Sequence, residues 1–79
     1  MIEKIKDYIK DEEFKMSIFE NRIHVINYEE ILSLENSRVS FKVVDKRIVL
    51  KGTNLTVKRL VNKELLLSGK ISEIVFFDE

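Results

Sequence analysis

From Phe14 onward, apolar and polar residues alternate one by one, and this period of two most constrains how the chain can fold. Residues 14–18, 39–43 and 55–58 show the alternation most clearly. Successive side chains of a β-strand point to opposite faces, so each of these segments would have one apolar and one polar face. The segments are short and are separated by polar turns, which is typical of an antiparallel all-β domain.

The first hairpin can be tested by its register. With a turn at Asp45-Lys46, Val43 opposes Ile48 and Phe41 opposes Leu50. Residues opposite one another share a face of the sheet, so this register collects the apolar side chains on one side. An odd loop without a bulge would place Phe41 beside a polar residue instead.

Two further turns extend the pattern. A turn over residues 51–54 would pair Leu50 with Leu55, and Gly52 and Asn54 tolerate the positive φ that such a turn requires. A loop at residues 61–63 would then set the apolar positions on either side of it opposite one another, with Val57 facing Leu67. The three hairpins predict an antiparallel β-meander over residues 38–67, forming a small sandwich or a partly open barrel.

Residues 1–13 follow another period. Ile2, Ile5 and Ile9 recur at helical spacing among charged residues, which predicts a short amphipathic helix. The chain of 79 residues therefore divides into a helical leader at 1–13 and a single all-β domain at 14–79. A helix this short needs a packing surface, and both the sheet and an external partner remain open as that surface.

A weak internal sequence repeat suggests a second possible architecture. Residues 49–52 and 66–69 share an apolar–apolar–polar–glycine frame, 17 residues apart. Stacked repeats of this kind build a short β-solenoid, which stays as the alternative although two copies are too few to define one. In either architecture Gly52 and Gly69 are expected to mark turns or bends.

The last strand differs from the others because apolar residues fall on both of its faces. They are Ile71, Ile74, Val75, Phe76 and Phe77. Such a strand is either central in a sandwich or covered by a partner, so these five residues are the candidate assembly interface.

The net charge of the chain is zero, but basic and acidic residues are concentrated in different parts of it. Residues 42–70 carry eight Lys and Arg against two acidic residues, and the predicted registers place Lys42, Lys51 and Lys58 on the same non-core face of the sheet. The candidate basic face comprises Lys42, Lys51, Lys58 and Arg59. A solvated face needs no partner; an anionic lipid surface or nucleic acid, or the acidic ends of a neighbouring copy, are the alternatives. Nucleic acid is the least favoured because the pI is about 6.6 and no aromatic residues interleave with the lysines.

The inventory of reactive residues argues against an enzyme. His24 is the only histidine, there is no cysteine, and the two glycines cannot form a phosphate-binding loop. We therefore expect no catalytic residues, no cofactor and no metal, and a half-buried position for His24 within a strand. The N-terminal stretch lacks the apolar core of a signal peptide, so a cytoplasmic location is expected.

Five stretches of the sequence match a known pattern: Phe19-Glu20-Asn21-Arg22, Val25-x-Asn27-Tyr28, Ile31-Leu32-Ser33-Leu34, the stretch from Ile48 through Gly52 to Val57, and the stretch from Glu64 through Gly69 to Ile74. Through them about three quarters of the chain resembles the YabP/YqfC family of sporulation proteins, and its YqfC branch more closely. Tyr28 and Glu29-Glu30 stand where the family favours a histidine and a glycine-containing turn, so no role rests on that histidine.

This resemblance implies a small non-enzymatic protein of the mother cell of an endospore-forming bacterium, with no catalytic residues to carry over. It implies a role in maturation of the spore envelope, its coat or cortex, at the forespore surface. The expected partners are further copies of the chain, a sporulation membrane protein, or both, with peripheral membrane association as a further expectation.

Overall fold

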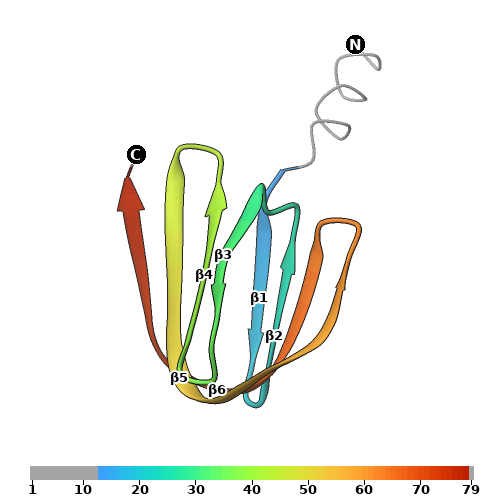
Figure 1. Cartoon of the computed structure of the whole chain (residues 1–79), viewed down its shortest axis with the longest axis vertical. Helices are drawn as coiled ribbons and strands as arrows, with labels where there is room; N and C mark the ends of the chain where they lie inside the picture. The colour runs from blue at the N-terminus through green and yellow to red at the C-terminus, as the bar shows by residue number, and fades with distance from the viewer. Residues whose placement is uncertain (1–12, 79) are drawn as a thin grey trace.

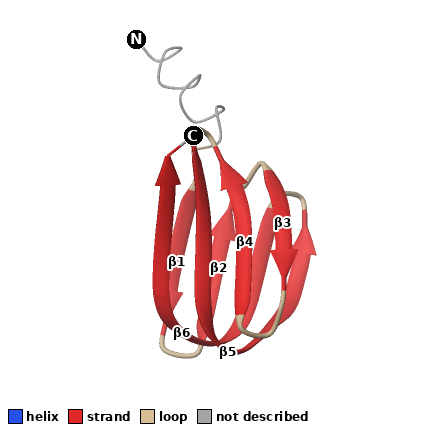
Figure 2. Cartoon of the chain, turned by 60° about the vertical axis from the view of Figure 1, so that its left-hand side comes forward, coloured by secondary structure: helices blue, strands red, loops and turns tan. Residues whose placement is uncertain are grey.

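The structure is a computed structural model that describes residues 13–78, all of whose regular elements are strands. The strands are β1 (Lys15–Phe19), β2 (Arg22–Ile26), β3 (Glu30–Leu34), β4 (Arg38–Val43), β5 (Lys46–Val61) and β6 (Glu64–Asp78). They form one antiparallel sheet in the order β1-β2-β6-β5-β4-β3 (Figures 1 and 2). The prediction of an antiparallel all-β fold is confirmed, whereas the helix expected over residues 1–13 lies outside the described residues apart from Glu13.

The two long strands bend in the middle and divide the sheet into two arms. Arm 1 contains β1, β2, residues 64–68 of β6 and residues 56–61 of β5; arm 2 contains β3, β4, residues 46–51 of β5 and residues 71–78 of β6. In Figure 1, β5 and β6 descend one side, turn together at the bottom and rise on the other side. A single open sheet thereby encloses a core between its own two halves. This arrangement agrees with the predicted small sandwich or partly open barrel. The antiparallel pairing excludes the solenoid alternative.

Two glycines allow the long strands to bend against each other. A Cβ on Gly52 would lie 2.0 Å from the carbonyl oxygen of Lys70, and one on Gly69 would lie 2.5 Å from that of Asn54. Gly69 also has a φ of 120°, a conformation that residues with a side chain rarely adopt. Register shifts interrupt the β5–β6 ladder at the same place, between Lys51 and Gly52 and between Thr53 and Thr56.

The turn expected over residues 51–54 is therefore wrong. β5 continues through this stretch, and Leu50 pairs with Val39 of β4 and Ile74 of β6 instead of Leu55. Glycine and asparagine mark the site in both arrangements, since a bulged bend requires positive φ as a tight turn does. Asn54 has that conformation, with φ of 56°.

For the β4–β5 hairpin the predicted face of each side chain is correct, but the predicted pairing is displaced. The β4–β5 turn lies at Val44-Asp45, so Phe41 pairs with Ile48, two residues from the predicted register. A shift of two keeps each side chain on its face, because the period of a strand is two. Val57 pairs with Leu67 as predicted.

The core lies between the arms. Its buried members come from both arms: Ile23, Val25, Leu65 and Leu67 from arm 1, Val39, Phe41, Val43, Ile48 and Leu50 from arm 2, and Leu55 from the bend. The Phe14 and Phe41 rings meet across it, with their centroids 6.1 Å apart. We call the side of each arm that faces this core its inner face, and the opposite side its outer face.

Candidate interaction surfaces

The five residues of the candidate assembly interface lie on a free sheet edge, because among the described residues this half of β6 has a neighbouring strand on one side only. Residues 71–78 of β6 pair with β5 on one side and with no other described strand on the other; this segment is the red outermost strand at the left of Figure 1. Ile71 and Ile74 pack against the core. Phe76, opposite Ile48 on the inner face, is nevertheless 54% exposed, and Phe77 on the outer face is 40% exposed.

The remaining edges carry features that discourage pairing with another chain. β1 is only five residues long and begins with Lys15. β3 has a bulge between Ile31 and Ser33. The free half of β5 has a bulge between Val57 and Arg59, with Lys58 inside it. Bulges, short strands and lysines are the usual protection of edge strands. Residues 73–78 of β6 have an uninterrupted register and no lysine or proline, so this edge is the least protected of the described sheet.

An arginine lies beside this edge without an acidic partner. The Arg47 guanidinium stacks 4.4 Å from the centroid of the Phe77 ring, on the outer face of arm 2. Within residues 13–78 no carboxylate pairs with it, and its buried Nε has no hydrogen-bond partner. Glu73, the acid on the same face of this edge as Phe77, has its Oε1 4.0 Å from Lys51 Nζ, and both side chains are about half exposed. Such a pair is weak, so Glu73 remains available to another cation.

The four residues of the candidate basic face are not brought together. Lys42 and Lys51 lie on the outer face of arm 2, whereas Lys58 and Arg59 lie beyond the bend, in arm 1. Two residues that the sequence analysis did not select take their place: Arg38 opposes Lys51, and Arg47 opposes Lys42. Alternation along β4 and β5 already places Arg38 and Arg47 on this face, and the two-residue change in the β4–β5 register sets them directly opposite the lysines.

The single histidine belongs to a small polar chain on the outer face of arm 1. His24 Nε2 donates a hydrogen bond to Glu64 Oε2 at 2.5 Å, and Arg59 Nη1 lies 3.6 Å from Glu64 Oε1. The hydrogen bond from His24 lowers the pKa of the Glu64 carboxyl below its ordinary value of 4.5, against partial desolvation, and the charge of Arg59 acts in the same direction. Ser17 of β1 lies opposite His24 in the register, and the contacts at Glu64 link side chains of neighbouring strands, which fits cross-strand stabilisation. The half-buried strand position predicted for His24 is confirmed.

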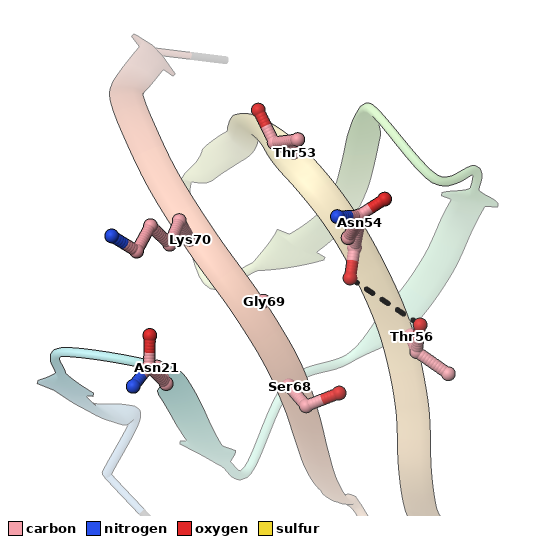
Figure 3. A pocket seen from close by; sticks show the side chains of 7 residues that line it. All are labelled: Asn21, Thr53, Asn54, Thr56, Ser68, Gly69 and Lys70. Atoms are coloured by element: carbon pink, nitrogen blue, oxygen red, sulfur yellow. Dashed lines mark hydrogen bonds between the residues drawn. The ribbon is translucent and has the colours of Figure 1, made fainter.

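A shallow depression of about 520 Å³ lies at the bend (Figure 3). It is lined by Asn21, Thr53, Asn54, Thr56, Ser68, Gly69 and Lys70. These residues provide hydroxyl, amide and ammonium groups, and none of them is acidic or aromatic. The depression therefore offers hydrogen-bonding groups and one amine, that of Lys70, with no histidine or carboxylate among its lining residues.

Among residues 13–78 no group of three or more His, Cys, Asp or Glu side chains is placed to hold a metal ion. The described part of the chain also contains no helix long and apolar enough to cross a membrane. Comparison of the chain with protein-family models, curated proteins and solved structures found no match.

Proposed function

We propose that this chain is a non-enzymatic structural or assembly protein that acts through protein–protein contacts made by the free edge of β6. The observation that carries the proposal is the edge itself: eight residues with one strand neighbour, apolar side chains on both faces and no protecting lysine or bulge from Glu73 onward. An edge strand presents unpaired backbone N–H and C=O groups, and a second strand that pairs with them extends the sheet.

The biological setting of the proposal is maturation of the spore envelope in an endospore-forming bacterium. It rests on the resemblance to YabP/YqfC proteins. Gly52 and Gly69, which belong to the most recognisable parts of that resemblance, are the bend glycines of the long strands. The resemblance therefore includes residues on which this bent-sheet architecture depends. A strain lacking the gene is expected to form spores with an incomplete coat or cortex under electron microscopy, and normal envelopes would contradict this setting.

The edge contact is tested by measuring the mass in solution by light scattering behind a sizing column, across a wide range of protein concentration. The wild-type chain is expected to rise from the 9.4 kDa of one chain to at least twice that mass. Phe76→Lys places a charge on the edge and is expected to restore the monomer, because pairing would bury that charge beside an apolar partner.

Val57→Lys is the matched control, since Val57 is a 36% exposed apolar residue on the other long free edge. It should leave the mass unchanged. A wild-type monomer at every concentration would remove self-assembly from the proposal, and equal effects of the two substitutions would show that the contact is not specific to β6.

A second candidate function, in which the chain contacts an anionic lipid surface, is favoured by one observation. Arg38, Lys42, Arg47 and Lys51 share the outer face of arm 2. A cluster of cations on one face attracts anionic headgroups within about a Debye length. Sedimentation with phosphatidylserine vesicles should then fall after Arg38→Glu with Lys51→Glu, and should be unaffected by Lys58→Glu with Arg59→Glu. Equal binding to neutral phosphatidylcholine vesicles would rule out this function.

A further inference from the structure

We infer that the partner of the β6 edge is a second copy of this chain, whose β6 pairs antiparallel with it about a two-fold axis at Val75. This inference rests on the proposed function of the edge and specifies its partner and register. The pairing would join the second arms of two copies into one continuous sheet. Phe76, now 54% exposed, would be covered by the other copy.

The regular part of the edge selects the register. A two-fold axis perpendicular to a sheet pairs outer residues with outer residues and inner with inner. With the axis at Val75, Ile74 of each copy opposes Phe76 of the other on the inner face, and the two Val75 side chains meet on the outer face. All these pairs are apolar, and they lie within the uninterrupted register of residues 73–78.

Neighbouring registers are poorer. An axis at Phe76 would set Ile74 against the carboxylate of Asp78. An axis at Ile74 would set Glu73 against Val75 and would bring in the irregular stretch between Ile71 and Glu73, where the β5–β6 ladder shifts. Each of the three registers makes three apolar cross-strand pairs, which are favourable by roughly 0.2–1 kcal/mol each relative to alanine pairs, so the positions of the carboxylates distinguish the registers. The Val75 register is the one that places Glu73 opposite Phe77, whose ring is covered by Arg47.

Charge complementarity supports the same register and identifies the partner as another copy. With the axis at Val75, Glu73 of one copy opposes Phe77 of the other, the residue whose ring is covered by Arg47. The carboxylate therefore arrives beside the guanidinium that has no acidic partner within residues 13–78. Symmetry forms this contact twice, and an unrelated strand would need an acid at the same position to provide it.

Pairing of β6 with the free half of β5 in another copy is less favourable. It would lay an apolar strand against the bulge between Val57 and Arg59, and Lys58 would interrupt the ladder. That contact would also be head-to-tail and would propagate without closure, whereas the two-fold contact closes as a dimer.

The chain contains no cysteine, so a single introduced thiol reports the register directly. Val75→Cys places two thiols opposite one another across the axis, at the cross-strand Cβ separation of about 4.5–5.5 Å. Mild oxidation or a short bifunctional maleimide is expected to convert most of this variant to a covalent dimer. Val61→Cys is the matched control, because Val61 is a 47% exposed valine on the free edge of β5, away from the axis, and its thiol should not become covalently linked.

A charge exchange tests the second contact. Glu73→Arg and Arg47→Glu should each weaken dimerisation about tenfold, and the double variant should recover most of the loss, because it restores both cross-copy pairs in opposite polarity. Circular dichroism of each variant verifies that the sheet is folded. Failure of the double variant to recover would overturn the register.

The outcomes separate this inference from the proposed function. Assembly that depends on Phe76 but leaves the Val75→Cys variant unlinked would overturn the two-fold register while the edge contact stands. Assembly in which Val61→Cys forms the covalent dimer and Val75→Cys does not would identify the β5 edge as the contact and overturn the inference. A wild-type chain that stays monomeric would overturn both the inference and self-assembly.

Discussion

At the scale of single residues, the polar contacts with most physical consequence link neighbouring strands of arm 1. Glu64 is the first residue of β6 and lies opposite Ile26 of β2. It accepts a hydrogen bond from His24, which also belongs to β2. Arg59 approaches the same carboxylate from β5. Three adjacent strands therefore meet at one acid, whose ionised form is favoured in the folded chain.

The pH dependence of stability follows from Glu64. Its pKa is lowered in the folded chain, so its stabilising contribution is present above the unfolded value of 4.5 and is lost as the pH falls through the folded pKa. Urea unfolding of the wild type and of Glu64→Gln from pH 7 to pH 3 should show a constant difference above about 4.5 that shrinks at lower pH. A difference that grows with acidification would contradict the lowered pKa. Glu73→Gln is the matched control, since its carboxylate has only a long, exposed contact with Lys51 and the difference from wild type should be small throughout.

At the scale of elements, the bend of β5 and β6 creates the architecture. Each strand serves both arms, which lets six strands form two facing layers from one sheet. The bend requires the backbones to approach at Gly52 and Gly69, where a side chain would collide with main-chain atoms that cannot rotate away. The bent halves that extend past β2 and β4 become the long free edges, so the bend also generates the β6 edge.

Alanine at either bend glycine should lower the free energy of unfolding by about 2–4 kcal/mol, through a steric clash at Gly52 and through both clash and positive φ at Gly69. For a domain of this size, that corresponds to a fall in Tm of at least about 10 °C. Ser72→Ala serves as a control, because it removes only an exposed hydrogen bond from Ser72 Oγ to the carbonyl oxygen of Lys51. Gly52→Ala with wild-type stability in urea would show that the strands can separate at the bend without cost.

At the scale of the whole molecule, the core is small and depends on contact between the arms. A chain of 79 residues is expected to have a free energy of unfolding of roughly 4–12 kcal/mol. Phe41 is the largest fully buried side chain, and its ring meets that of Phe14 across the core. A substantial part of the total stability therefore depends on this one position.

Phe41→Ala should cost about 3–5 kcal/mol and leave much of the protein unfolded at 37 °C, because a cavity would open between two arms joined by the β5–β6 bend. Phe19→Ala is the same substitution at a 50% exposed site and should cost about 1 kcal/mol, including its contact with Arg22. Chemical denaturation followed by circular dichroism measures both. Equal costs would show that the arms do not share a single core.

The all-β fold class, the strands at residues 14–18, 39–43 and 55–58 and most of the core can be predicted from the order of residues alone. Alternation places Val39, Phe41, Ile48 and Leu50 on one face in any register that shifts by an even number of residues. These side chains were therefore identified although the first hairpin register was displaced by two. The face of each side chain follows from alternation within its own strand, so it can be predicted without knowing which residue of another strand lies opposite.

Three features depend instead on contacts between distant parts of the chain: residues 51–54 bend a continuous strand, the end of β6 is an edge, and Arg38 and Arg47 lie directly opposite the lysines of arm 2. A glycine beside an asparagine has the same local signal in a hairpin turn and in a bulged bend. The distinction is made by the close approach of Gly52 to the carbonyl of Lys70, which lies 18 positions farther along the chain. Edges and cross-strand pairs likewise depend on which distant strand lies alongside, and packing of the two arms around their common core determines which strand that is.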